Sequence, residues 1–268
     1  MEASPNLYIV DCCVQYGRPA IPAGQPYLSP KELLVDMDRL GIAEAWCTDS
    51  RALENAPSLG NRLLSEELAG HPRLHPVWVV LPPGTRETIS PEDLPAALAS
   101  AGALLARADP ARHGYSIAEW CAGRIWSVLE RFRVPLLLDV NGMWDHLNTL
   151  LLAHPGLPVI LTNIGYRCPR MLYPLLEQYG NLRIEISSYL VNEGLREIAE
   201  RFGVERLLFG SGAPAAGMEA ALGTLRFADL NDHDTAKVAG RNLMTLLNET
   251  AHRLKTVEGN ANGTETNS

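Results

Sequence analysis

The chain has 268 residues, of which 46% are hydrophobic and 20% charged, and its formal net charge is -8. This composition is typical of a folded globular protein and excludes a disordered chain. The acidic charge disfavours nucleic-acid binding, and no apolar run reaches the roughly 18 residues that a membrane span needs. Five cysteines without a CxxC pair, and no basic or apolar leader, predict a cytoplasmic protein with reduced thiols.

Short apolar runs alternate with amphipathic segments along the whole chain. Two helices are predicted to begin at Ser29 and Ser90, because each serine precedes a proline that suits the first helical turn. The apolar runs predict strands at 7–10, 42–48, 75–81, 103–106, 134–140, 158–162, 182–187 and 206–210. The other helices are predicted at 58–69, 116–132, 147–153, 169–179, 193–202, 218–227 and 232–247.

This alternation predicts an α/β fold, a single (β/α)8 TIM barrel, because that fold has eight strands with helices between them. The strands are continuous apolar runs, as expected for strands buried on both faces. We expect the barrel over 1–254 with an extra C-terminal helix, and a disordered tail over 255–268. A doubly wound open sheet is the alternative, which the lack of a GxGxxG turn after the first strand disfavours.

The segments around the strand ends resemble the amidohydrolase superfamily, in its amidohydrolase-related branch of metal-dependent hydrolases and decarboxylases. The best segments are IVDCCVQ (9–15), PLLLD (135–139), PVILTNIG (158–165), ERLLFGSGAP (205–214) and AGRNLMTLL (239–247). The resemblance extends over most of the chain. It implies a barrel whose site lies at the carboxyl ends of the strands, and a hydrolase-like activity, either C–N hydrolysis or decarboxylation.

Members of this superfamily bind one or two divalent metals through an HxH pair on the first strand, histidines on the fifth and sixth, and an aspartate on the eighth. The matching positions hold Cys13, Gln15, Asp139, Asn163 and Gly212. A catalytic Zn²⁺ usually has three protein ligands that are thiolates, imidazoles or carboxylates, and only Cys13 and Asp139 qualify. We therefore predict no metal ligand and no cofactor. Zinc or another divalent metal in an atypical site is the disfavoured alternative.

Three residues after strand ends are candidate catalytic groups. His113 is either a general acid/base or an exposed loop histidine, and Asp139 is either an acid/base or an ion-pair partner. Cys13 is a nucleophile if a neighbour lowers its pKa, but a small buried filler is the favoured interpretation. Strand alternation predicts that Cys12 lies on the opposite face and packs under the helices.

Arginines are also concentrated after the predicted strand ends. Arg51, Arg107, Arg112 and Arg167 suit a carboxylate or phosphate ligand, although pairing with neighbouring aspartates is an equal alternative. The candidate substrate-binding residues are Gln15, Arg51, Arg112, Asn163 and Arg167.

Two further polar features at the strand ends are given structural interpretations. We expect Asp11 to bond backbone amides or a rim arginine. A nucleophilic serine at Ser187 or Ser188 is disfavoured, because the sequence places no base beside it.

The leading hypothesis is a barrel without the usual metal site. It would bind a small acidic substrate, or turn it over by acid/base hydrolysis or decarboxylation. The alternatives are a non-catalytic partner subunit of an active relative and a metal-dependent hydrolase with an atypical site. Expected partners are a small anionic ligand and either a second copy of the chain or a related amidohydrolase subunit, but neither nucleic acid nor membrane. An open polar pocket favours the first hypothesis, and a filled mouth with a large apolar patch favours a partner subunit.

Overall fold

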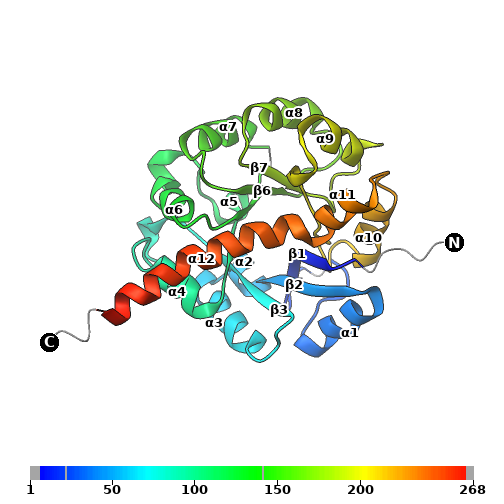
Figure 1. Cartoon of the computed structure of the whole chain (residues 1–268). Helices are drawn as coiled ribbons and strands as arrows, with labels where there is room; N and C mark the ends of the chain where they lie inside the picture. The colour runs from blue at the N-terminus through cyan, green and yellow to red at the C-terminus, as the bar shows by residue number, and fades with distance from the viewer. Residues whose placement is uncertain (1–6, 22, 141, 264–268) are drawn as a thin grey trace.

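The computed structural model describes residues 7–21, 23–140 and 142–263. Over these residues, eight parallel strands form one sheet in sequence order, ringed by helices (Figure 1). The strands are β1 (Ile9–Tyr16), β2 (Ile42–Asp49), β3 (Leu74–Val79), β4 (Leu105–Ala108), β5 (Leu136–Asp139), β6 (Val159–Thr162), β7 (Leu182–Glu185) and β8 (Leu207–Leu208).

Hydrogen bonds between β1 and the segment after β8 close the ring. The Gly212 N–H donates to the Cys13 carbonyl over 2.9 Å. The buried Asp11 adds a side-chain link, because its Oδ1 accepts the N–H groups of Ser211 at 2.9 Å and Cys13 at 3.0 Å. The prediction of a TIM barrel is confirmed, and so is the expectation that Asp11 bonds backbone amides.

The helices follow the strands around the outside of the ring (Figure 1). The Ser29 hydroxyl caps α1 by accepting the Glu32 N–H over 3.3 Å, as its sequence position predicts. The helix predicted from Ser90 begins only at Leu94, with Pro95 in its first turn. The helices are α1 (Pro30–Leu40), α2 (Ser50–Glu54), α3 (Pro57–Leu68), α4 (Leu94–Ala101), α5 (Pro110–His113), α6 (Glu119–Arg131), α7 (Trp144–Ala153), α8 (Pro169–Gln178), α9 (Gly194–Phe202), α10 (Met218–Arg226), α11 (Asp232–Ala236) and α12 (Asn242–Gly263), with short helical turns η1 (Pro83–Thr85), η2 (Val204–Arg206) and η3 (Lys237–Arg241).

The barrel interior is apolar and sealed at its amino end. The inner strand residues are Val10, Cys12, Val77, Leu105, Leu137, Ile160 and Leu208. Trp46, Leu243 and Leu246 extend this cluster to α12, which crosses the barrel in Figure 1. The extra C-terminal helix is confirmed. Its backbone continues through 255–263, part of the tail predicted to be disordered, and 264–268 lie outside the described residues.

Two strands differ from the sequence-based expectation in ways that matter for the site. β4 lies two residues later than predicted, so Arg107 is part of the strand rather than of the following loop. β1 continues to Tyr16, and its register against β2 shifts between Asp11 and Val14. Cys12 lies two residues after Val10 and so shares its inward face, and the prediction that Cys12 packs under the helices is wrong. The irregularity lets the next residue, Cys13, join the same inner cluster.

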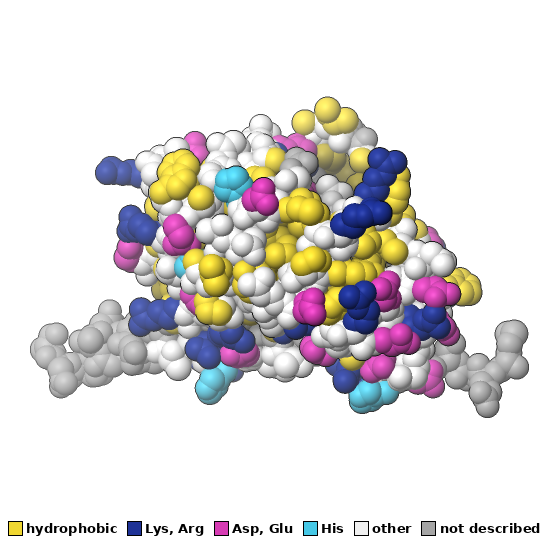
Figure 2. All heavy atoms as spheres, turned by 90° about the horizontal axis from the view of Figure 1, so that it is seen from above, with side chains coloured by type: hydrophobic (Ala, Val, Ile, Leu, Met, Phe, Trp, Pro, Cys, Tyr) yellow, Lys and Arg dark blue, Asp and Glu magenta, His cyan; other side chains and the backbone are white. Residues whose placement is uncertain are grey.

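The outer surface is mixed. Within the described residues, no helix combines the length and apolar character that crossing a bilayer requires. On the face seen in Figure 2, hydrophobic side chains lie among arginines and carboxylates. Exposed hydrophobic residues of α7, α8 and the loop before α9 include Leu152, Met171 and Leu190.

Candidate active site at the carboxyl ends of the strands

A polar cavity of about 380 Å³ opens at the carboxyl ends of the strands. Strand ends on both sides of the ring contribute to its lining, as is usual for sites in this fold. Its polar side chains include Gln15, Arg107, Arg112, Asp139, Glu185 and Ser187. The mouth is therefore open and polar rather than filled by bulky side chains.

Arg107 of β4 supplies a positive charge inside the barrel. Its Nη1 donates to Cys13 Sγ over 3.6 Å, and its buried Nε–H has no partner among the described residues. Burial lowers the pKa of Arg107, but Cys13, Asp109 and Asp139 raise it by more, so the guanidinium stays charged. A buried charged donor without a full set of partners is costly unless a ligand completes it.

Glu185 ends β7 and is a feature that the sequence reasoning missed. It is 1% exposed, and its Oε2 accepts the Ser187 hydroxyl at 2.8 Å, while its Oε1 accepts the Ser187 N–H. Burial raises its pKa from 4.5 to about 7, against the opposing effects of the Ser187 bonds and Arg107. A charged residue at an inward position of an apolar run was the sequence signal that could have found it.

Glu185 also changes the assessment of Ser187. The strand pattern predicts no neighbouring base for this serine, but the Glu185 carboxyl at the end of β7 accepts its hydroxyl. The expectation that Ser187 lacks a base is wrong, because the turn after β7 brings the Ser187 hydroxyl onto the Glu185 carboxyl.

Two of the three predicted catalytic residues line the cavity. Burial raises the pKa of Cys13 to about 12 although Arg107 lowers it, so the group is a thiol near neutral pH and poorly suited as a nucleophile. Asp139 accepts the Asn163 amide at 3.2 Å. His113 lies outside the cavity lining, at the end of α5, with its Nε2 3.3 Å from the Ala52 carbonyl.

Three of the five predicted binding residues also line the cavity, namely Gln15, Arg112 and Asn163. Gln15 Nε2 donates to Ser50 Oγ over 3.0 Å. Arg112 Nε lies 3.0 Å from Asp109 Oδ2 at the rim.

The other two predicted binding residues lie outside the cavity lining. Arg51 is paired with Asp49 at 2.7 Å and Glu67 at 3.1 Å, as the ion-pair alternative predicts. The Arg167 guanidinium lies 5.3 Å from the centre of the Tyr166 ring.

The side chains that line the cavity differ from the histidine-rich ligand set that the resemblance implies. Within the described residues, no group of three or more His, Cys, Asp or Glu side chains is placed to hold a metal ion. Gly212 offers no side chain, and a Cβ there would lie 3.0 Å from Ser187 Oγ. The Cys13 thiol contacts the Arg107 guanidinium, which would repel a second cation.

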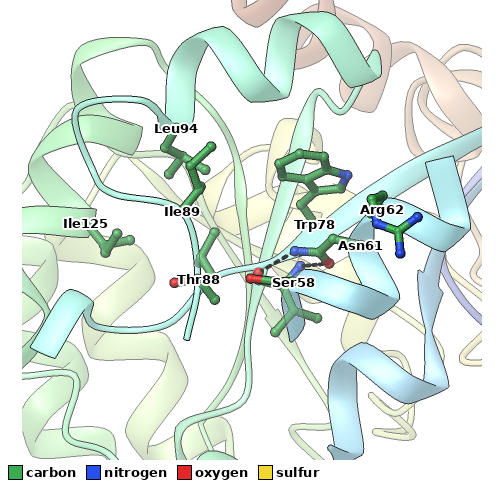
Figure 3. Close-up of a pocket in the computed structure, with 10 residues that line it drawn as sticks. Ser58, Asn61, Arg62, Trp78, Thr88, Ile89, Leu94 and Ile125 are labelled. Atoms are coloured by element: carbon green, nitrogen blue, oxygen red, sulfur yellow. Dashed lines mark hydrogen bonds between the residues drawn. The ribbon is translucent and has the colours of Figure 1, made fainter. Parts of the chain in front are cut away.

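A second, smaller cavity lies outside the barrel, between α3, β3 and α4 (Figure 3). Its volume is about 180 Å³, and Trp78, Ile89 and Leu94 make its wall largely apolar. The Asn61 amide points toward it but bonds both backbone groups of Val79 at 2.9 Å. This pocket therefore offers no acid–base chemistry, which the mouth of the barrel does.

Comparison with known proteins agrees with this architecture. The solved structures that resemble the chain include an uncharacterized TIM-barrel protein from Bordetella bronchiseptica (16% identity, TM-score 0.71, 91% of this chain and 99% of that chain covered), 2,6-dihydroxybenzoate decarboxylase from Rhizobium (16%, 0.69, 90% and 99%), and 5-carboxyvanillate decarboxylase from Sphingomonas paucimobilis (13%, 0.64, 90% and 99%). At these identities the similarity shows the fold alone. No protein with a curated function matches the sequence. A model of the amidohydrolase family matches residues 6–247, nearly the whole chain, and the protein therefore belongs to the amidohydrolase family.

Proposed function

We propose that the mouth of the barrel binds a small carboxylic acid without a metal ion and turns it over by acid–base chemistry, as a hydrolase or decarboxylase. The observation that carries this proposal is Arg107, a cation inside the barrel whose Nε–H has no partner among the described residues. A carboxylate is the ligand that best satisfies a guanidinium, because the two groups match in charge and in the spacing of donors and acceptors.

The surroundings of Arg107 support a carboxylate ligand further. Arg112 adds a second guanidinium at the rim, and Gln15 and Ser187 add neutral polar groups. The cavity of about 380 Å³ is large enough for a single-ring acid. Two similar barrels, the 2,6-dihydroxybenzoate and 5-carboxyvanillate decarboxylases, are also named for aromatic acids.

The fixed charge of Arg107 supports a mechanism without a metal. In the superfamily, a metal ion polarises the reacting group. Here the metal-ligand positions hold Cys13, Gln15, Asp139, Asn163 and Gly212, a poor donor set for zinc. A preorganised guanidinium stabilises developing negative charge by the same electrostatic principle, although with a smaller charge.

The open polar cavity favours this function over a non-catalytic partner subunit. A mouth that served only as scaffold would gain stability from apolar filling, whereas this one keeps charged groups in a partly buried position. Assembly with a second copy or a related subunit, and location in the cytoplasm, stay predictions.

Calorimetric titration with three acids tests the proposal. The probes are 2,6-dihydroxybenzoate, 5-carboxyvanillate and 2-pyrone-4,6-dicarboxylate, the lactone for which another similar barrel, from Pseudomonas putida, is named. We expect at least one to bind the wild type, and Arg107→Gln to weaken that binding by about 10- to 100-fold, because a hydrogen bond to a charged group contributes about 1.5–3 kcal/mol.

Arg183→Gln is the matched control. It makes the same replacement at the start of β7, where Arg183 Nη1 bonds the Asn181 carbonyl at 3.3 Å. We expect it to leave the affinity unchanged. If no acid binds the wild type, or if the two variants weaken binding equally, the site is not a carboxylate site centred on Arg107.

A further inference from the structure

We propose that Glu185 and Ser187 form a proton-transfer pair, in which the Ser187 hydroxyl carries protons between a bound ligand and the buried Glu185 carboxyl. The inference rests on the proposed function, since it supplies the acid–base group that turnover of a carboxylic acid needs. It identifies two further catalytic residues, neither of which was singled out as catalytic from the sequence.

The two groups differ in exposure at the cavity. Both line it, but Ser187 is partly exposed whereas Glu185 is only 1% exposed. The distance from Ser187 Oγ to Glu185 Oε2 is 2.8 Å, which is hydrogen-bond length. A proton can therefore move from the cavity to the carboxyl in two short steps through one hydroxyl.

The segment after the neighbouring strand β8 leaves space for this pair. A Cβ on Gly210 would lie 2.5 Å from Glu185 Cγ, and a Cβ on Gly212 would lie 3.0 Å from Ser187 Oγ. Each partner of the pair thus faces a glycine beyond β8. Gly212 also has a φ of +63°, which a residue with a side chain adopts only at a cost. A larger residue at either position would displace the carboxyl or the hydroxyl.

The charges around the carboxyl also support the pair. Arg107 on β4 lowers the pKa of Glu185 and Asp11 on β1 raises it, while Cys12 and Cys13 on β1 are uncharged thiols at neutral pH. Burial is the largest effect, and the resulting pKa of about 7 allows both protonation states near neutral pH. An acid–base group works best when its pKa is close to the working pH.

In hydrolysis, a water oxygen attacks the carbonyl carbon and gives one proton to Ser187 Oγ, while the Ser187 proton passes to Glu185. When the C–O or C–N bond breaks, the proton returns by the same route to the leaving oxygen or nitrogen. In decarboxylation the protonated pair delivers its proton to the carbon that loses CO2, and solvent reprotonates Glu185. Neither route requires an oxidant or reductant.

The test compares the wild type, Glu185→Gln, Ser187→Ala and the double variant, using whichever of the three acids the wild type binds. Protons exchanged on binding are counted by calorimetry in buffers of different ionisation enthalpy. Turnover, followed by absorbance, is measured from about one pH unit below to one above the Glu185 pKa of about 7.

We expect wild-type binding to exchange protons around neutral pH, and Glu185→Gln to abolish that exchange. Each single variant should lower turnover by about 100-fold or more, and both should lose the same limb of the pH profile. The double variant should be little slower than either single one, because the two residues act as one unit. Glu249→Gln in α12, whose carboxylate pairs with Arg133 at 3.0 Å, is the matched control and should retain the exchange and the profile.

Proton exchange that persists unchanged in Glu185→Gln would overturn the pair even if the acid is bound and not turned over. Losses that multiply in the double variant, or a pH limb retained in both single variants, would also overturn it. In each of these cases binding itself persists, so the carboxylate site stands. Failure of the wild type to bind any probe contradicts the proposed function and, with it, this inference.

Discussion

The two ends of the barrel are built from the same strands but hold opposite kinds of residues. At the amino end, Trp46, Leu243 and Leu246 seal the interior against α12 (Figure 1). At the carboxyl end, charged and hydroxyl groups surround an open cavity. Stability and chemistry are therefore separated in this fold, because one end can be packed closely while the other keeps poorly solvated polar groups.

Two arginines, one near each end of the barrel, show the same difference. Arg183, at the start of β7, lies near Arg206 and Arg133, and burial with these like charges lowers its pKa to about 10. Arg107 has the acids Asp109 and Asp139 nearby, which raise its pKa against the effect of burial. The electrostatic environment thus favours a cation at the carboxyl end and disfavours one at the amino end.

Truncating the sealed end should have the largest effect on stability. Leu243 is 1% exposed between α12 and the inner strand residues. We expect Leu243→Ala to lower the free energy of unfolding by about 2–5 kcal/mol through lost burial and a new cavity. Acid binding by the folded fraction should be unchanged. Chemical denaturation and calorimetric titration of the same sample measure both, and a loss of affinity without a loss of stability would contradict the separation of the two ends.

At the open end, Glu185 should make stability depend on pH. Its pKa of about 7 in the folded protein exceeds the ordinary 4.5, so the folded state binds this proton more tightly than the unfolded chain does. The stabilisation is complete below about pH 4.5 and is lost as the pH rises through 7. We expect the stability of wild type relative to Glu185→Gln to fall over this range, by about 3 kcal/mol at most.

Urea unfolding of the two proteins at a series of pH values measures this difference. Asp11, whose pKa burial also raises, is present in both proteins, so its effect cancels in the comparison. A relative stability that is constant or rises with pH would contradict the burial of an uncompensated carboxyl at Glu185.

Arg51 should give the smallest effect. It was a candidate ligand-binding residue, but in the structure it pairs with Asp49 and Glu67 and its side chain is 37% exposed. We expect Arg51→Gln to lower stability by about 1–2 kcal/mol, because the buried Asp49 loses its cation but keeps the backbone N–H bonds of Arg51 and Ala52, and to leave acid binding unchanged. If Arg51→Gln binds the acid tenfold more weakly in calorimetry, Arg51 is a binding residue after all.

The fold could be predicted from the sequence because strand and helix periodicities are local signals that recur in every βα unit. Asp11 was also anticipated, since a carboxylate at a strand end commonly bonds nearby amides. The residues of the candidate site could be predicted only in part. Arg51 and Arg112 are alike in sequence, and only tertiary packing separates the one that lines the cavity from the one that does not.

Glu185 was missed for a related reason. It lies within an apolar run, where a charged residue is easily assigned to the exposed face of a strand. The inward position of Glu185 depends on the alternation of side chains along β7. Its contact with Ser187 depends on the local geometry after the strand. Arg107 was expected in a loop, because the fourth strand was predicted to end two residues before it does.

A metal-free carboxylate site can be tested by calorimetric titration of chelator-treated protein, purified without a metal-affinity tag, with 2,6-dihydroxybenzoate and the other two acids. Metal content is determined by elemental analysis on the same sample before and after treatment. We expect substoichiometric metal and an affinity that chelation does not change. About one zinc, manganese or iron per chain, with binding that disappears on chelation and returns with the metal, would contradict a metal-free carboxylate site.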